Sequence, residues 1–559
     1  MNRNTNAYST VDKVEVPRSH WPRNHTVLTT FNAGKLVPIY FNEDIIPGTT
    51  IKLNLSYVVR MQTPLNPTMD NLIIDTYWFW APKYWYWVHF KEFFGENPNG
   101  AWNNTTQYNT PMCNVTTAYG PNDLANYLGV PQGVTGFKYD RIGLSFYQHI
   151  WNTWFRSQPL QSPWVYDTSD NDLTSDGTIQ TGYGLLPVQK TFDYFTSSLP
   201  EPQQALPGTT GPARLPLGTE AAVKGTGMAL GLTDGTDNFA LSGVSGIGLT
   251  QNVMSGSGGA YGQNVGTARS GTYGSNKAFG VTTDPTKSGV IADLSNATAA
   301  TVNALRYTIA IQRLMERFAI YGNFYRDTLR QWGAIASSMD LQIPEYLGGN
   351  RTGINIRQQT QTSGTTTSSP LGETGAYSVT INSTHEFTKS MSMHGMIMGL
   401  VCVRIDKHKY SQGLPRQFSR TQMLDHFFPE FSHTGNSPIY NRELYLQADT
   451  VVNSDGNPVN DDVFRYKEYG QEYIVAQDMA TGEMNPTYAQ TLAYWHYGDL
   501  YASLPVLGNT WIQEDGTLID RTLTVSSSEA NQFFGDFYIE EKVSAPIPLN
   551  RLPGLMDHY

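Results

Sequence analysis

The sequence predicts an all-β domain with large insertions, and three observations support this. Charged residues make up only 15% of the 559-residue chain, against about 25% in an average soluble protein. Asn, Thr, Gly, Ser and Tyr take their place, a mix that favours strands joined by long polar loops. Strand patterns occur toward both ends of the chain and flank a loop-rich middle. One elaborated β domain is therefore favoured over the roughly three small domains that length alone suggests.

The predicted strands differ in how they are buried. Segment 51–61 alternates apolar and polar residues, and one face carries Ile51, Leu53, Leu55, Tyr57 and Val59. Segment 71–82 is a nearly continuous apolar run, as expected for a strand buried on both faces. Further strands are predicted at 376–381, 396–406, 472–477 and 533–543.

Two segments have the apolar spacing of helices. In segment 144–158 the recurring residues are Leu144, Tyr147, Ile150, Trp151, Trp154 and Phe155. Segment 302–333 is the strongest helix pattern in the chain, and its apolar face carries Ile311, Leu314, Met315, Phe318 and Tyr321.

Composition divides the chain into three regions. Region 1–204 is rich in strand patterns. Region 205–300 holds 19 of the 51 glycines, with many Ser and Thr and few large apolar residues. Such a stretch cannot form much core of its own, so it is either a flexible linker or a long surface insertion. Region 301–559 opens with the helix pattern and returns to strands.

The most unusual feature is an aromatic run. Eleven of the eighteen residues from Tyr77 to Phe94 are aromatic, among them Trp78, Phe79, Trp80, Trp85 and Trp87. Asp75, Lys83, His89, Lys91 and Glu92 interrupt the run, and Pro82 would break a helix through it, so a membrane span is excluded.

On a strand, Tyr77 and Phe79 share one face and Trp78 and Trp80 the other. So many exposed rings would make a patch larger than soluble monomers tolerate. We therefore expect one face in the core and the other covered by inserted loops or an adjacent subunit. A purely intrachain core and stacking on DNA stay open as alternatives.

Charge and cysteine content limit the partners. The net charge is −11, whereas a protein that wraps nucleic acid by itself should be basic. Contact with nucleic acid would then be local or through a basic partner. The two cysteines, Cys113 and Cys402, do not indicate a disulfide framework, and the N-terminus has no apolar stretch typical of a secretory signal. We expect synthesis in a reducing compartment.

The sequence contains no motif that predicts catalysis, so no catalytic, cofactor-binding or metal-binding residues are assigned and the protein is expected not to be an enzyme. The acidic segment 167–177 carries Asp167, Asp170, Asp172 and Asp176 without the spacing of a calcium loop. We interpret it as a solvated loop, with an incidental divalent site as the alternative.

Two groups of arginines are candidates for contact with phosphates. Arg313 and Arg317 belong to the 302–333 helix pattern, and Arg416 and Arg420 flank Phe418, a mixture compatible with stacking on single strands. Solvated or ion-paired faces are the simpler interpretation of both groups.

A series of segments resembles the major capsid proteins of small single-stranded DNA phages, the Microviridae, with the gokushovirus-like branch most similar. They occur in the family's order and are 17–87, 150–161, 193–203, 310–333, 341–349, 385–406, 412–420, 503–513 and 548–559. The similarity covers nearly everything outside 205–300 and scattered loops.

This resemblance implies a viral jelly roll, an eight-stranded β-sandwich with long loop insertions and a few helices. It also implies self-assembly of 60 copies into a T=1 icosahedral shell around circular single-stranded DNA, with a small basic packaging protein as internal partner. The 205–300 region would be the variable surface protrusion linked to host attachment. The protein would be assembled in the host cytoplasm and reside in the virion, without membrane insertion.

A second class of function remains open at the level of sequence. An aromatic-rich β-sandwich could instead bind carbohydrate or a receptor as a separate module. The capsid-like segments along the whole chain favour the shell protein.

Overall fold

The computed structural model describes residues 17–98, 100, 106–174, 184–205, 302–362, 364–365, 370–372 and 374–549, and the backbone of five short strands between 206 and 301. The chain divides into two compact units, one made of Met1–Pro202 with Phe318–Tyr559 and the other of Gln203–Arg317. Among the described residues, no helix has both the length and the apolar character required to span a bilayer.

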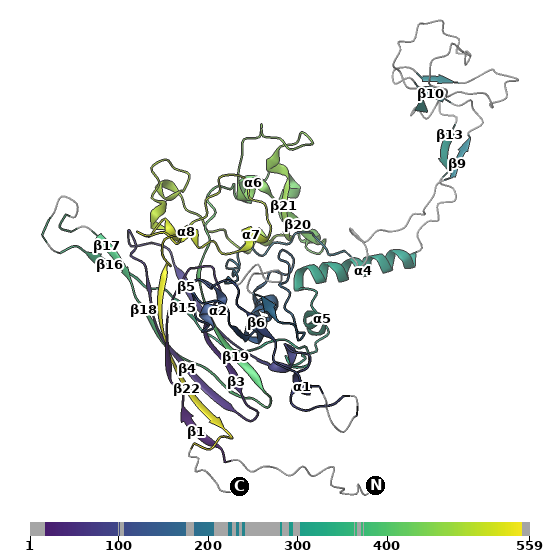
Figure 1. The fold of residues 1–559 in the computed structure, drawn as a ribbon. Helices are drawn as coiled ribbons and strands as arrows, with labels where there is room; N and C mark the ends of the chain where they lie inside the picture. Colours follow the sequence, from purple (N-terminus) through teal and green to yellow (C-terminus); the bar gives the residue numbers. More distant parts are fainter. Residues whose placement is uncertain are drawn as a thin grey trace, which may run out of the picture. The chain divides into compact units, whose positions relative to one another are not determined.

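Two antiparallel sheets form the body of the larger unit (Figure 1). In the first, strand β22 (Phe533–Ala545) pairs on one side with β1 (Ser19–Pro22) and β2 (His25–Phe31), and on the other with β4 (Thr50–Met61). Beyond β4 lies β18 (Thr380–Ser390).

The second sheet is built around strand β5 (Leu72–Pro82), the amino-terminal part of the aromatic run. On one side β5 pairs with β14 (Glu345–Gly348) and β15 (Arg351–Gly353), and on the other with β19 (Gly395–Ile405). The edge beyond β19 is β3 (Val37–Ile45).

The main core lies between the two sheets, because apolar side chains of both contribute to one buried cluster. The alternation predicted for 51–61 is confirmed, since its five apolar residues are all buried in this cluster. From the second sheet, Ile74, Trp78, Trp80 and Val401 enter the same cluster. The fold is thus a β-sandwich, as an all-β prediction requires.

A second buried cluster covers the other face of β5 and β19. It is formed by Phe79, Met398 and Cys402 from the sheet and by helix α3 (Ile142–Ile150), which contributes Phe146 and Tyr147. A π-helical turn, Trp151–Phe155, continues α3, so the helical spacing predicted for 144–158 is largely confirmed. Both faces of β5 and β19 are therefore covered within one chain.

The long connections of the sandwich carry the remaining elements. Between β5 and β14 these are α1 (Phe90–Phe93), β6 (Met112–Asn114), α2 (Leu124–Tyr127), β7 (Lys138–Asp140), α3, β8 (Leu173–Thr174), α4 (Val302–Tyr321) and α5 (Tyr325–Gln331). A hairpin of β16 (Ile356–Thr360) and β17 (Thr374–Ser378) precedes β18. Between β19 and β22 lie β20 (Asn436–Tyr440), α6 (Asn441–Leu444), β21 (Val463–Glu468), α7 (Asn509–Ile512) and α8 (Thr517–Asp520).

Two sequence predictions are wrong in detail. The strand expected at 472–477 is instead a short 3-10 turn, Gln471–Tyr473, which follows Gly470 in the left-handed region at φ +78°. The helix expected over 302–333 is interrupted at Gly322, whose φ is +91°, and forms α4 and α5. Of its predicted apolar face only Met315 is buried.

Within Gln203–Arg317 the described backbone forms two small antiparallel sheets. Strand β9 (Ala222–Gly225) pairs with β13 (Val290–Asp293). Strand β10 (Gly231–Thr233) pairs with β11 (Asn238–Ala240) and β12 (Gly280–Val281).

Candidate functional site

The alternating rings of β5 point into two different clusters. Trp78 is fully buried between the sheets, with ring centroids 5.5 Å from Tyr40 and 5.7 Å from Phe387. Trp80 lies in the same cluster. Space for the Trp78 indole comes from the neighbouring strand β19, where Gly399 is the register partner of Trp78. A Cβ on Gly399 would come within 2.5 Å of the Trp78 ring.

The opposite face of β5 is covered by the chain's own inserted segments. Tyr77 meets Phe155 edge to face at 5.0 Å, and Phe79 lies 5.8 Å from Trp154 and 5.6 Å from Tyr346. These partners come from the turn after α3 and from β14. The alternation expected for Tyr77, Trp78, Phe79 and Trp80 is thus present.

The remaining tryptophans of the run lie against the second cluster. Trp87 is buried, and its indole N–H donates a 2.6 Å hydrogen bond to Asp170. Trp85 is partly buried and packs beside His149. Beyond them the run becomes exposed, with Phe93 and Phe94 both large and accessible.

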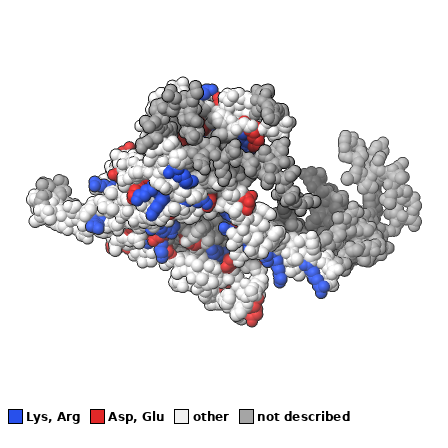
Figure 2. Space-filling model, turned by 90° about the horizontal axis from the view of Figure 1, so that it is seen from below, with Lys and Arg blue, Asp and Glu red and all other residues white. Residues whose placement is uncertain are grey.

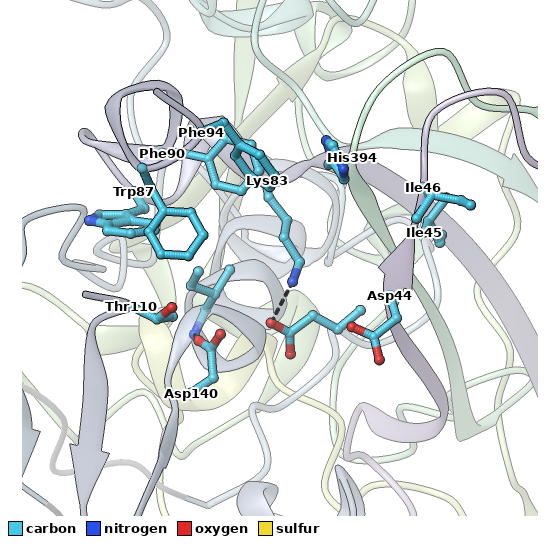
Figure 3. Close-up of a pocket in the computed structure, with 13 residues that line it drawn as sticks. Asp44, Ile45, Ile46, Lys83, Trp87, Phe90, Phe94, Thr110, Asp140 and His394 are labelled. Carbon is cyan, nitrogen blue, oxygen red and sulfur yellow. Dashed lines mark hydrogen bonds and ion pairs between the residues drawn. The ribbon is translucent and has the colours of Figure 1, made fainter. Parts of the chain in front are cut away.

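These exposed rings border a pocket of about 220 Å³ (Figure 3). Phe94 stacks on His394 with centroids 4.6 Å apart. Deeper in the pocket the Lys83 ammonium lies 2.8 Å from a Glu43 carboxylate oxygen. Burial and, after it, the adjacent Glu43 carboxylate together raise the pKa of Asp140 to about 8. The pocket therefore combines an aromatic rim with one carboxyl group, that of Asp140, which favours holding a proton.

The candidate arginines have different surroundings. Arg313 and Arg317 are exposed on α4. Arg416 and Arg420 are brought together by Glu472, whose carboxylate lies 3.6 Å from each guanidinium. Arg420 also lies over the Tyr473 ring at 4.5 Å. The ion-paired interpretation fits Arg416 and Arg420, because their charges are engaged within the chain.

The acidic segment 167–177 is also engaged with neighbours. Asp167 lies 3.7 Å from Arg141, Asp170 contacts Trp87 and His89, and Asp172 lies 2.7 Å from Lys138. Asp176 lies outside the described residues. In the described part of the chain, no group of three or more His, Cys, Asp or Glu is arranged to hold a metal ion.

Sequence reasoning missed a buried charged network at one end of the sandwich. His408 contacts Asp499 through Nδ1 at 3.3 Å and Glu514 through Nε2 at 3.1 Å, while Lys190 lies 3.0 Å from Asp499. All four side chains are buried. The partners are 91 and 106 residues away from His408, so no local spacing could have revealed them.

The charges of this network stabilise one another. Burial alone would lower the pKa of His408, but Glu514 and Asp499 outweigh it and raise the pKa to about 10. Burial likewise opposes ionisation of Asp499, yet Lys190 and His408 lower its pKa well below the usual value. The network joins the end of β19 to two loops, since Glu514 also accepts from the Ile405 backbone N–H at 3.3 Å.

Taken together, the prominent sites are packing surfaces and structural networks on a two-layer antiparallel sandwich. Two-sheet antiparallel sandwiches include viral capsid and lectin domains. Comparison with known proteins distinguishes between them. The family described as "Capsid protein (F protein)" matches residues 9–555. The chain therefore belongs to this family of phage capsid proteins.

Individual relatives agree over the full length. The chain is 32% identical over 593 residues to capsid protein VP1 of Chlamydia phage 1, covering 98% of both chains. It is 31% identical over 572 residues to VP1 of Spiroplasma virus 4, covering 99% of this chain and 98% of the relative. It is 29% identical to VP1 of Bdellovibrio phage phiMH2K, covering 100% and 99%. The protein is accordingly a major capsid protein and a component of the virion.

Proposed function

We propose that copies of this capsid protein assemble in the host cytoplasm into a T=1 shell of 60 subunits around a circular single-stranded DNA genome. Each subunit would contribute an eight-stranded jelly roll, with its inserted loops elaborating the shell. The observation that carries this proposal is the order of the strands.

The strand order is nested when β1 and β2 are counted as one strand position and β14 and β15 as another. The first position then pairs with β22, the last strand. Inward from the two ends, β3 pairs with β19, β4 with β18 and β5 with β14–β15. This pattern supports a jelly roll, because a chain folded into one long hairpin and then rolled into two sheets would give it.

A separate basic packaging protein is proposed as the partner that condenses the genome. The chain's net charge of −11 opposes direct wrapping of DNA. On the face seen in Figure 2, Lys and Arg are interspersed with Asp and Glu among many uncharged residues. Such a surface supports local contacts with DNA and leaves bulk neutralisation to the partner.

Purified particles test the genome and the partner together. The expected content is DNA that a single-strand-specific nuclease digests after extraction, that exonuclease does not degrade, and that co-purifies with a small basic protein. Particles that contain double-stranded or linear DNA would contradict this proposal while leaving shell formation intact.

Host attachment is proposed for the insertion near 205–300. Gln203–Arg317 forms a compact unit of its own, which supports a module that could change without altering the shell. We expect that replacing residues 222–293 by a short Gly-Ser linker preserves particle yield and abolishes adsorption to host cells. Adsorption at the wild-type level would contradict a receptor role, and loss of particles would assign the insertion to assembly.

A further inference from the structure

The segment 421–434 is an ordered surface feature that the single chain leaves almost entirely exposed. Every residue in it except Phe428 is exposed. It nevertheless has defined local structure, with 3-10 turns at Met423–Asp425 and Pro429–Phe431. The Asp425 carboxylate accepts backbone hydrogen bonds of 2.8 Å from both Thr421 and Gln422.

This segment exposes several large apolar side chains close together, which is unusual for a protein that stays monomeric. Met423 is 70% exposed, and Leu424, Phe427 and Phe431 are exposed as well. Phe427 stacks on Tyr469 at 5.3 Å, which holds the segment in place without burying it. Large apolar side chains gathered on one exposed segment in this way are typical of a protein interface.

A second exposed surface of the same unit is formed by residues 321–335, which include α5. None of these residues is buried. Trp332 is 74% and Ile335 94% exposed, and Tyr325 is also accessible. Arg326 anchors the segment, since its guanidinium lies 5.4 Å from the centre of the Trp154 ring.

The two surfaces carry opposite charge. Segment 421–434 contains Asp425 and Glu430 and no Lys or Arg, and the Glu430 side chain is exposed. Segment 321–335 contains two arginines and one aspartate, and Asp327 lies 3.4 Å from Arg326. The net positive charge is therefore that of Arg330, which is exposed.

We propose that segment 421–434 of one subunit packs against segment 321–335 of a neighbouring copy of this chain, with Glu430 facing Arg330. The occupant is a second copy because this is a shell protein whose single chain offers both complementary halves. A contact between two different patches is heterologous, and it repeats around a symmetry axis until a ring closes. This inference rests on the proposed shell and names one of its contacts.

Charge reversal tests the pairing directly. Glu430→Arg and Arg330→Glu should each reduce the yield of closed particles at least tenfold, because each places like charges across the contact. The double variant should restore particles toward the wild-type yield. Asp455→Arg, a reversal on an exposed turn outside both segments, is the matched control and should assemble normally.

Two results would overturn the inference. Single reversals that assemble like the control would show that the segments do not meet. A double variant no better than either single, with all variants melting like the wild type as free subunits, would show that the two charges do not face each other. Absence of particles from the wild-type chain would instead contradict the proposed shell itself.

A disulfide trap provides a second measurement that does not depend on charge. Cys113 and Cys402 are both buried, so cysteines added by Trp332→Cys and Phe431→Cys would be the accessible ones. Particles of the double variant should give, under mild oxidation, a ladder of linked subunits that ends at the size of one ring. Each single variant should remain monomeric on the same gel, and a monomeric double variant in intact particles would count against the contact.

Discussion

His408 shows how much of the fold depends on a single buried charge. Its removal would leave Asp499 and Glu514 in the interior without their shared partner. Losing one member of a buried ion pair costs about 3–5 kcal/mol. We therefore expect His408→Ala to lower subunit stability by about that amount, measured by denaturant unfolding of the free subunit. His433→Ala, at an exposed position, is the control and should change little.

The pH dependence of this effect has a definite sign. The pKa of His408 is raised by folding to about 10, so its contribution is complete below the unfolded value near 6.5 and is lost as the pH rises through 10. The gap between wild type and His408→Ala should shrink between pH 7 and 10. A gap that widens over this range would contradict a charged His408.

Asp140 is expected to destabilise the folded chain as the pH rises. Burial and the nearby Glu43 raise its pKa to about 8, so the folded state retains a proton that the unfolded state releases near pH 4. Stability from this group is present below about pH 4 and lost as the pH rises through 8. Asp140→Asn should weaken the fall of the melting temperature between about pH 4 and pH 8. A wild-type-like slope in that variant would assign the dependence elsewhere.

At the scale of elements, large rings of strand β5 pack against small residues of the neighbouring strand β19. Gly399 faces Trp78, and an added methyl group would enter the space of the indole. Overpacking of this kind costs about 1–3 kcal/mol. Gly399→Ala should lower the thermal melting temperature and the soluble yield. Gly353→Ala on β15, where an added Cβ meets nothing within 4 Å, should be neutral. Equal behaviour of the two variants would contradict this packing.

The elements that could be predicted from sequence are those whose pattern reflects burial. The alternation in β4 and the continuous apolar run in β5 both follow from which faces are covered. The failed strand at 472–477 had the composition of a strand, but Tyr473 and Ile474 are exposed beside a tight turn. These two residues are exposed in this chain, and composition alone cannot distinguish exposed from buried apolar residues.

Contacts between segments that are far apart in the sequence could not be predicted, for a different reason. Gly399 pairs with Trp78 although the two residues are hundreds of positions apart in the sequence. His408 contacts Glu514, which lies 106 residues further along the chain. The aromatic run could be expected to need a core face and a covered face. Which segments supply the cover, namely α3 with its following turn and β14, depends on the complete fold.

At the scale of the whole molecule, an acidic chain of low charge density is consistent with a subunit that packs against copies of itself. Polar uncharged residues can be buried between subunits at lower desolvation cost than charges. Segments 321–335 and 421–434 both expose large apolar side chains, and we propose that they pack against each other between subunits. The two antiparallel sheets form the body of the subunit that carries both segments.

The most direct test of the account is cryo-electron microscopy of the purified protein, produced with and without its packaging partner. We predict uniform icosahedral particles whose reconstruction contains 60 copies, each with a two-sheet sandwich in which β2 lies beside β22. Protein that remains monomeric or trimeric under both conditions would contradict self-assembly as its function. Glycan binding would then be the next property to measure.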